Sequence, residues 1–200
     1  MFDNKQNMFI VIDGPDGTGK TTISRLLVEM FIKQNKNAVL TAEPTSSPLG
    51  VQIRLALKTQ TNPQILLDMF LQDRSQHCKD FILPALNQGK IVVCDRYKLS
   101  TACYQQSDSH TAKQLLAMQK HLMDPDYTFI LYFKNIKTIQ NRMSNRKRSL
   151  DVFENVHFQQ KINDDFIRLA KELQSQNVFL ISAEQNTKQI LKQIMEVINV

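Results

Sequence analysis

The 200-residue sequence contains no long apolar run, only three cysteines and only five glycines. No run approaches the roughly 20 apolar residues that a transmembrane helix needs, so we expect no membrane span. The N-terminus is largely polar before a short apolar stretch, which is not the pattern of a signal peptide. Cys78, Cys94 and Cys103 are too scattered for a disulfide framework or a zinc site, and the four histidines have no metal-ligand spacing. We therefore expect a reduced, cytoplasmic protein without membrane contacts.

Acidic residues are absent from residues 127–150, although six basic residues lie there. They are Lys134, Lys137, Arg142, Arg146, Lys147 and Arg148. The segment thus carries the whole formal net charge of +6, and the rest of the chain sums to zero. Proteins that bind nucleic acid usually spread their basic residues over a face or a stripe. The local excess argues against a nucleic-acid partner.

Five short apolar runs divide the chain, and segments with helical periodicity separate them. The runs are Met8–Ile12, Ala38–Leu40, Ile91–Cys94, Phe129–Phe133 and Val178–Ile181. Continuous apolar runs of this length are typical of strands that are covered on both faces of a parallel sheet. The order of strands and helices predicts one α/β domain over residues 1–200, with a doubly wound, five-stranded parallel sheet flanked by helices.

Ligands of such sheets bind beyond the carboxyl ends of the strands, so the candidate site lies in the segments that follow the apolar runs. These segments are residues 13–22, 43–50, 95–105 and 182–185, and the chain from 134 onward. Residues 43–48 contain two prolines and three hydroxyl residues, which predicts a loop there.

Three of the five glycines, at positions 14, 17 and 19, lie in a segment that matches the pattern G-x-x-x-x-G-K-[ST]. A buried-strand pattern precedes the segment and a helical pattern follows it, whereas a chance glycine-rich turn would need neither. In this arrangement backbone N–H groups and a helix N-terminus surround a phosphate chain. Lys20 is expected to reach the terminal phosphates and the Thr21 hydroxyl to bind Mg²⁺. The predicted nucleoside triphosphate site consists of Gly14, Pro15, Asp16, Gly17, Thr18, Gly19, Lys20, Thr21 and Thr22.

Asp95 and Arg96 follow the third apolar run directly. A carboxylate at the end of a buried strand beside a phosphate loop is the usual position of an acid that organises Mg²⁺. Arg96 can offer a planar fork of donors to a phosphate, either the transferred group or its acceptor. The alternative is an Asp–Arg pair that only caps the sheet.

A helix is predicted from about residue 64 to residue 86, and Arg74 lies on its apolar side. The residues at helical spacing on that side are Leu66, Phe70, His77, Cys78 and Phe81. A guanidinium on the inward face of a helix needs a polar partner. One alternative is a buried salt bridge between Arg74 and a residue of the sheet. The other is a base-binding pair, in which Phe70 stacks on a flat ring and Arg74 donates to its edge.

These motifs, in this order and spacing, resemble thymidylate kinases, which are P-loop kinases of nucleoside monophosphates. The resemblance covers essentially the whole chain. It rests on the phosphate loop with an acid at Asp16, on Glu43-Pro44, on Phe70-x-x-x-Arg74, on Asp95-Arg96-Tyr97 followed by residues 100–105, and on Pro125-Asp126. It implies a homodimeric dTMP kinase that transfers a phosphoryl group from ATP to dTMP with Mg²⁺, making dTDP for dTTP biosynthesis.

The resemblance also implies roles at the acceptor site. Phe70 would stack on thymine, and Arg74 and Thr101 would meet the base. Tyr104 would lie against the sugar and disfavour a ribose 2′-OH, and Asp16 would approach the 3′-OH. The substrate-binding set is then Asp16, Glu43, Phe70, Arg74, Arg96, Thr101, Tyr104 and Gln105.

In the same resemblance the basic segment becomes a small lid, at approximately residues 142–152, that closes over ATP. Arg142 would bind the nucleotide, as would Ala183 near adenine, while Arg146 and Arg148 would act on the transferred phosphate. Members of the family place such an arginine either in the phosphate loop or in the lid, and Gly17 occupies the loop position here. The alternative is a solvated charge run. The predicted catalytic set is Lys20, Asp95, Arg96, Arg146 and Arg148, and the metal set is Thr21 and Asp95.

Two other classes share the phosphate loop. Deoxynucleoside kinases also carry Glu-Pro after the second strand, where the glutamate, here Glu43, would act as general base for a sugar hydroxyl. They typically have Glu-Arg-Ser after the third strand, where this chain has Asp95-Arg96-Tyr97. GTPase switches need an N-K-x-D motif after a later strand, and the sequence has none. For dTMP the attacking phosphate oxygen is already ionised at neutral pH, so no general base is required.

Overall fold

The computed structural model describes residues 7–59, 61–135, 137–138, 141, 152–174 and 177–198. Within these residues the strands are β1 (Met8–Asp13), β2 (Ala38–Ala42), β3 (Ile91–Asp95), β4 (Tyr127–Tyr132) and β5 (Val178–Ser182). They form one parallel sheet in the order β2-β3-β1-β4-β5. The predicted α/β fold with a five-stranded parallel sheet is therefore confirmed.

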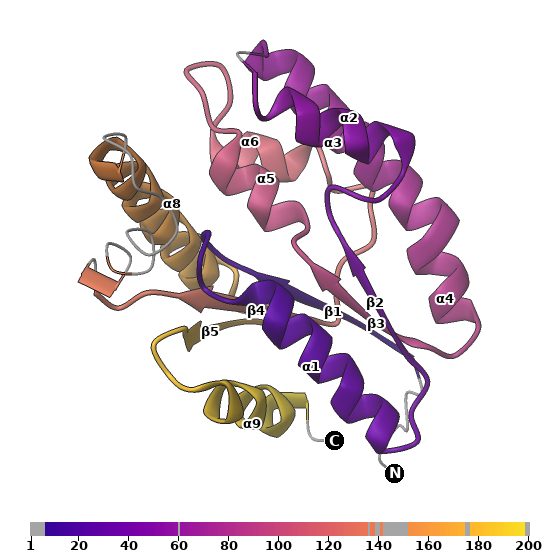
Figure 1. Cartoon of the computed structure of the whole chain (residues 1–200). Coiled ribbons are helices and arrows are strands. Elements are labelled where there is room, and N and C mark those ends of the chain that lie inside the picture. The colour runs from indigo at the N-terminus through magenta and orange to yellow at the C-terminus, as the bar shows by residue number, and fades with distance from the viewer. Residues whose placement is uncertain are drawn as a thin grey trace.

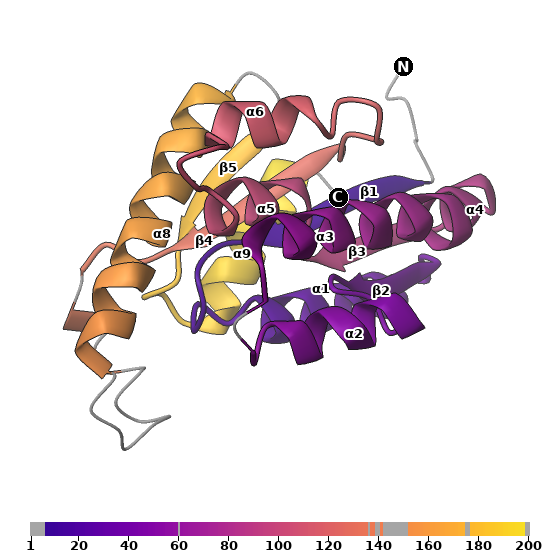
Figure 2. The same cartoon turned by 90° about the horizontal axis from the view of Figure 1, so that it is seen from above.

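Helices cover both faces of the sheet (Figures 1 and 2). On one face lie α1 (Lys20–Lys33) and α9 (Thr187–Ile198), which share a core with Ile12 of β1 and Leu131 of β4. The other face is covered by α3 (Pro63–His77), the π-helical turn η1 (Cys78–Ile82), α4 (Leu83–Asn87), α5 (Lys98–Tyr104), α6 (Ala112–Ala117) and α8 (Val152–Glu172). The short helix α2 (Pro48–Ala56) packs on α3. The chain is thus doubly wound, as expected.

The central strands are buried on both faces, whereas the edge strand β2 is not. Every residue of β1 and β3 is buried, including the aspartate that ends each of them. In β2 burial alternates along the strand, and Leu40 is exposed. A continuous apolar run is needed only where helices cover both faces, so the predicted pattern applies best to the middle of the sheet.

The helix predicted over residues 64–86 forms, but it is not a regular α-helix throughout. It runs as α3, widens into η1 and continues as α4. Pro84 explains the widening, because proline lacks an N–H and its ring clashes with the carbonyl of the preceding turn. A π-helical turn adds one residue to a helix and relieves this conflict.

The prediction of the buried side of this helix is partly wrong. Phe81 is 40% exposed, and Leu66 and Phe70 are only partly buried, whereas Leu67 and Ile82 are buried. The extra residue in η1 rotates the following side chains about the helix axis, so Ile82 takes the core position that regular spacing assigns to Phe81. Leu66 and Phe70 instead face a cavity that is described below.

The loop predicted at residues 43–48 ends one residue earlier, because Pro48 begins α2. Ser47 caps this helix, and its hydroxyl accepts a hydrogen bond from the Gly50 N–H at 3.0 Å. Proline is favoured at the first position of a helix because its missing N–H would have no partner there. The proline at 48 thus starts a helix that the sequence analysis did not predict.

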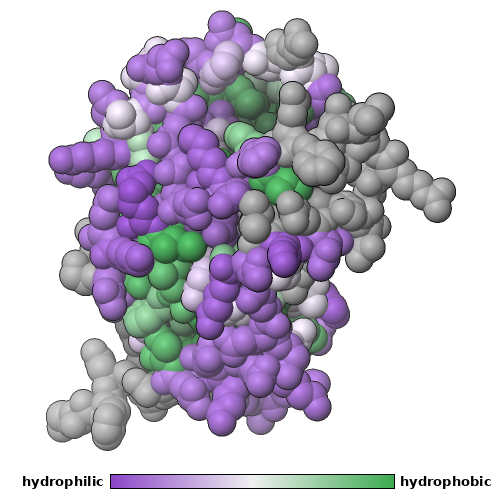
Figure 3. All heavy atoms as spheres, turned by 90° about the vertical axis from the view of Figure 1, so that its left-hand side faces the viewer, coloured by the Kyte–Doolittle hydropathy of each residue, from purple (hydrophilic) through white to green (hydrophobic). Residues whose placement is uncertain are grey.

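The surface on the side of α8 is mostly hydrophilic, with separate hydrophobic patches between polar residues (Figure 3). No helix in the described part of the chain is both long and apolar enough to cross a bilayer.

The register of the sheet brings three segments to one level at its carboxyl edge. Ile12 of β1 and Ala42 of β2 both pair with Asp95 of β3. The residues that follow, Asp13, Glu43 and Arg96, therefore leave the sheet side by side. This edge is where ligands bind in parallel α/β sheets.

Candidate functional site

The phosphate loop between β1 and α1 has a backbone that only glycine tolerates at Gly14. Its φ is 135°, and a Cβ atom there would lie 2.1 Å from the backbone oxygen of Leu131. Gly17 and Gly19 also have positive φ angles, of 84° and 92°. The loop curls tightly against β4 and leads into α1, whose first turn carries Lys20, Thr21 and Thr22. This confirms the strand–loop–helix arrangement that the sequence predicts.

Lys20 is buried within the loop, and its Nζ donates to the carbonyl of Pro15 at 2.7 Å. Thr18 donates to the same carbonyl at 2.8 Å. Burial, with the nearby charge of Arg96, lowers the pKa of Lys20 to about 8. Apart from nearby carboxylates, only a backbone carbonyl balances the ammonium group, so a phosphate chain would be a much stronger partner.

Thr21 and Asp95, the two predicted metal-binding residues, lie in contact. The Thr21 hydroxyl donates to Oδ2 of Asp95. The other oxygen of Asp95, Oδ1, is buried and has no hydrogen-bond partner among the described residues. A buried carboxylate oxygen without a donor is costly unless a cation or its water shell satisfies it. This pair of hard oxygen donors fits Mg²⁺.

Arg96 joins the phosphate loop to the segment after β3. Its φ is 72°, which is uncommon for a residue with a side chain. The guanidinium donates to the Ser100 hydroxyl at 3.0 Å and to the Asp16 carboxylate, and it lies 5.2 Å from the ring centre of Tyr104. Burial alone would lower the pKa of Arg96, but Tyr104 and the surrounding aspartates, including Asp13, raise it. Arg96 therefore stays charged at the junction of two segments.

Asp13 stabilises the contact between the phosphate loop and the segment after β3. It is fully buried and accepts hydrogen bonds from the Gly14 N–H at 2.9 Å, the Ser100 N–H at 3.0 Å and the Ser100 hydroxyl at 2.6 Å. Burial raises the pKa of its carboxyl group, although Arg96 and these donors work in the opposite direction. Asp13 thus ties the phosphate loop to α5.

A cavity of about 680 Å³ opens beside the phosphate loop, within the size range of small-molecule sites. Its lining includes the whole predicted substrate-binding set: Asp16, Glu43, Phe70, Arg74, Arg96, Thr101, Tyr104 and Gln105. Residues far apart in the sequence, on four segments, thus meet in one cavity. Its other walls include Leu66 of α3, which lies one turn before Phe70, and Phe158 and Gln159 of α8, which no sequence pattern marked.

Arg74 is almost completely buried, at 1% exposure, and each of its three side-chain nitrogens has a hydrogen-bond partner. Nε and Nη2 lie 2.7 and 2.6 Å from Oε2 of Glu43, and Nη2 also donates to the carbonyl of Tyr97 at 3.0 Å. Nη1 donates to the Thr101 hydroxyl at 2.9 Å and to the side-chain carbonyl of Gln119. Burial alone would lower the pKa of Arg74, but Glu43 more than offsets this and raises it. The buried salt bridge of the first alternative is present, and the contact with a base stays a prediction.

Glu43 has both carboxylate oxygens engaged. Oε2 accepts from Arg74, while Oε1 lies 2.9 Å from Nδ1 of His77. The other ring nitrogen of His77 lies 2.7 Å from the Thr41 hydroxyl. Cys94 Sγ also lies near Glu43 and His77, but it donates to the carbonyl of Arg96 at 3.1 Å. Each of these three side chains thus already has a hydrogen-bond partner within the protein.

Three polar residues in this region escaped the sequence analysis. Asp73, next to Arg74, accepts from the Thr45 N–H at 2.8 Å and from the hydroxyls of Thr45 and Ser47. Gln159 accepts from the Asp16 N–H at 3.1 Å and donates to the Asp16 carboxylate at 3.3 Å. Gln119 contacts Arg74. Asp73 could have been suspected as a second polar residue on an inward helix face, but Gln119 and Gln159 have no distinguishing pattern.

One further predicted residue, Ala183, lies at the carboxyl edge of the sheet. Ala183 is buried directly after β5, and its N–H donates to the carbonyl of Tyr132 at 2.8 Å. Glu184 accepts from the N–H of Asn135, which joins the segments after β4 and β5. Arg142, Arg146 and Arg148 lie outside the described residues, as does the predicted lid except for Val152, at which α8 begins.

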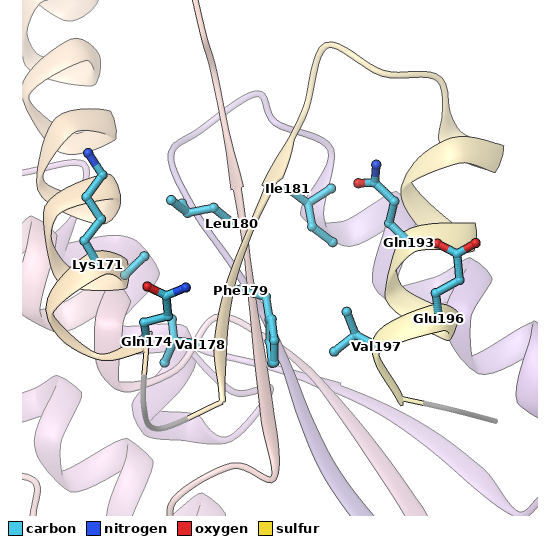
Figure 4. A pocket seen from close by; sticks show the side chains of 10 residues that line it. Lys171, Gln174, Val178, Phe179, Leu180, Ile181, Gln193, Glu196 and Val197 are labelled. Carbon is cyan, nitrogen blue, oxygen red and sulfur yellow. The ribbon is translucent and has the colours of Figure 1, made fainter.

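A second hollow, of about 690 Å³, lies along the edge strand β5 between α8 and α9 (Figure 4). Leu180 lies on the α8 side of the strand and Ile181 on the α9 side, with Lys171 and Glu196 at the two borders. None of the predicted site residues lines it. The candidate site is therefore the cavity beside the phosphate loop.

Comparison with known proteins identifies the family of the chain. The family model described as thymidylate kinase matches residues 12–194. The chain is 34% identical to the thymidylate kinase of Chlamydia felis, covering 94% of this chain and 95% of the relative. It is 30% identical to the probable thymidylate kinase of Thermococcus kodakarensis, covering 96% and 97%. The crystal structure of thymidylate kinase from Ehrlichia chaffeensis superposes with a TM-score of 0.76 at 28% identity, covering 97% of this chain and 99% of that one. The chain belongs to the thymidylate kinase family.

Proposed function

We propose that this protein transfers the terminal phosphoryl group of ATP to dTMP, forming dTDP and ADP. Family membership supports the activity, and one observation of the structure carries the proposal. A cavity lined by the whole predicted acceptor set lies beside the phosphate loop, and the Asp16–Arg96 ion pair lies at their junction. An acceptor in the cavity would thus place its phosphate next to the triphosphate. The enzyme's task is to position the two phosphates and to neutralise their charge.

On the donor side, Lys20 would leave the Pro15 carbonyl for the terminal phosphates, and Arg96 would hold the phosphate of dTMP. Thr21 and Asp95 would hold Mg²⁺, directly or through water. When bound, the metal ion supplies positive charge against the phosphate oxygens. The attacking oxygen of dTMP is already ionised at neutral pH, so no side chain has to remove a proton.

On the acceptor side, Phe70 is the partly buried aromatic residue on which thymine would stack, with Thr101 and Arg74 at the base edge. The hydroxyl of Tyr104 is buried without a partner among the described residues, and burial raises its pKa, so it remains a neutral hydroxyl. This hydroxyl would lie against the sugar. Asp16 and Gln105 complete the wall.

The state of Glu43 argues against a deoxynucleoside kinase. A general base for a sugar hydroxyl needs a free oxygen within reach of that hydroxyl. Both oxygens of Glu43 are held, by Arg74 and by His77, and its side chain is 3% exposed. Glu43 would therefore orient Arg74 in the acceptor site.

The basic segment would act as a lid over ATP. Arg142 would bind the nucleotide, Arg146 or Arg148 would stabilise the transferred phosphoryl group, and Ala183 would lie near adenine. Replacing both Arg146 and Arg148 by alanine should lower kcat by about 10²-fold, as expected when a charge on the transition state is removed. Near-wild-type turnover of this double variant would leave the segment a solvated charge run.

We also propose that the protein is a cytoplasmic homodimer. All three cysteines are buried and unpaired, which suits a reducing compartment. Val51 and Leu55, one turn apart on α2, and Ile65 on α3 are 49%, 59% and 56% exposed. Exposed apolar side chains on two packed helices are typical of a subunit interface. Sedimentation of the wild type and of Leu55→Lys tests this, since a dimer that uses this face should dissociate in the variant.

The activity is tested by ADP release with Mg²⁺ and ATP against dTMP, thymidine and other nucleosides and nucleoside monophosphates. We expect dTMP to be turned over far faster than thymidine, because Arg96 offers a partner for a phosphate. Faster turnover of thymidine would overturn the proposal in favour of a nucleoside kinase. Replacement of Phe70 by alanine should weaken the binding of dTMP but not the binding of ATP.

A further inference from the structure

We propose that Gln119 is a positioning residue, which holds the guanidinium of Arg74 in place for the nucleobase of the acceptor. It follows α6 and is completely buried, at 0% exposure. Its side-chain carbonyl accepts from Nη1 of Arg74, and its amide group donates to the backbone carbonyl of Leu115 at 2.8 Å. The inference rests on the proposed function, because it assigns Arg74 to the acceptor site.

The hydrogen bonds of Gln119 fix which way its amide points. The carbonyl of Leu115 can only accept, so the NH₂ group of Gln119 must face it, and the side-chain oxygen must face Arg74. The same side chain thereby supplies an acceptor to the guanidinium and a donor to the last turn of α6. Neither an aliphatic side chain nor a hydroxyl of shorter reach does both.

Gln119 is also the neutral partner that Nη1 needs. Nε and Nη2 of Arg74 already use Oε2 of Glu43 and the carbonyl of Tyr97. Glu43 balances the single positive charge of Arg74, so a second carboxylate is not required. Nη1 then needs a second acceptor beside Thr101, and an unpaired donor is costly on a side chain that is 1% exposed.

The two acceptors of Nη1 differ in position. Thr101 lines the acceptor cavity, whereas Gln119 does not. When a base enters, the hydroxyl of Thr101 is free to turn toward it, but Gln119 stays behind Arg74. Gln119 therefore acts on the substrate only through Arg74, by keeping the guanidinium from shifting when Thr101 changes partner.

The test compares Gln119→Met, which removes the acceptor at similar volume, with Gln119→Glu, which retains an acceptor oxygen. We expect Gln119→Met to raise the dTMP KM about fivefold or more, with the ATP KM within about twofold and kcat little changed, because a buried donor loses its partner beside the base. Gln119→Glu keeps the acceptor for Nη1 but loses the donor to Leu115, so it should raise the dTMP KM less than Gln119→Met does. If Gln119→Met does not fold, Gln119→Asn can replace it. The side chain of asparagine is one methylene shorter, so its carbonyl lies farther from Arg74, and the dTMP KM should again rise.

Ile190→Ala is the matched control. Ile190 is buried in the core between α9 and the sheet and lines no part of the acceptor cavity. This variant should lower the Tm without raising the dTMP KM. An unchanged dTMP KM in Gln119→Met, or equal effects of the Met and Glu variants, would overturn the positioning role. Failure of the wild type to phosphorylate dTMP would instead overturn the proposed function, and the inference with it.

Discussion

The phosphate loop and the wall of the acceptor cavity meet at one edge of the sheet but satisfy their charges differently. In the loop, the ammonium of Lys20 donates to a backbone carbonyl and has only the charges of nearby aspartates beside it, and Oδ1 of Asp95 has no partner among the described residues. In the wall, each side-chain nitrogen of Arg74 and both oxygens of Glu43 have partners within the protein. The difference indicates that the loop receives its missing partners from ligands, whereas the wall is assembled before the substrate arrives.

Such a division suits the reaction. A triphosphate with its metal ion brings several charges, so the loop can keep a few polar groups poorly satisfied until it binds. A nucleobase is uncharged, so it offers only hydrogen bonds and stacking to hold a side chain in place. The guanidinium that would meet it therefore has to be held in advance.

The largest effect is expected in the loop. Lys20→Met removes the only side-chain cation that the structure places within it, and we expect kcat to fall about 10³-fold, equivalent to about 4 kcal/mol of transition-state stabilisation. Thermal unfolding should change little or shift slightly upward, because the ammonium is held by a single backbone carbonyl. A large loss of stability in this variant would mean that the polar groups of the loop, like those of the wall, already have strong partners in the free protein.

In the wall, the same kind of substitution should act on stability as well as on binding. Arg74→Met leaves the buried carboxylate of Glu43 without its cation, so we expect a loss of about 3–5 kcal/mol in the free energy of unfolding. The dTMP KM should rise at least tenfold, with the ATP KM unchanged. Denaturant unfolding and steady-state kinetics measure the two effects.

A double variant separates these effects. Arg74→Met with Glu43→Gln removes both charges, and it should recover much of the stability but none of the dTMP affinity. If stability falls in Arg74→Met while the dTMP KM does not move, Arg74 is only a structural ion-pair partner, and its assignment to the base would be wrong.

The smallest effect follows from the pKa of Lys20. In the free protein this pKa is lowered to about 8, and the negative charge of ATP should raise it, so the complex binds more protons than the free protein above that pH. ATP affinity should therefore fall as the pH rises through about 8, by at most about tenfold per pH unit. Calorimetry in buffers of different ionisation enthalpy would detect the proton uptake. Lys20→Arg, which stays charged, should show no such uptake.

The sequence was most informative where a motif depends on local geometry. The phosphate loop, the five strands and the helix after Pro63 could be predicted, because glycine spacing, apolar runs and helical periodicity are properties of neighbouring residues. The predicted acceptor set also meets in one cavity, although its members come from separate segments. Family motifs, and not periodicity, identified most of that set.

The predictions that failed concern the placement of side chains around a helix. Phe81 was assigned to the buried side because regular spacing puts it there, but the π-helical turn before Pro84 rotates it outward. Pro48 was placed at the end of a loop, because two prolines and three hydroxyl residues fall within residues 43–48, but it starts α2. In both cases the effect of a proline depends on its position in the helix. Pro48 is favoured at the first position of α2, whereas Pro84 distorts the turn before it.

By itself, the sequence determined the fold class, the phosphate loop and the family, since short patterns of neighbouring residues indicate each of them. Only the tertiary structure decided what surrounds Arg74. Glu43, Thr101 and Gln119 lie on three different segments, and no local pattern connects them to Arg74. They come together because the parallel register sets Glu43 beside Arg96 at the edge of the sheet, and because burial of Arg74 requires an acceptor for each of its five N–H groups.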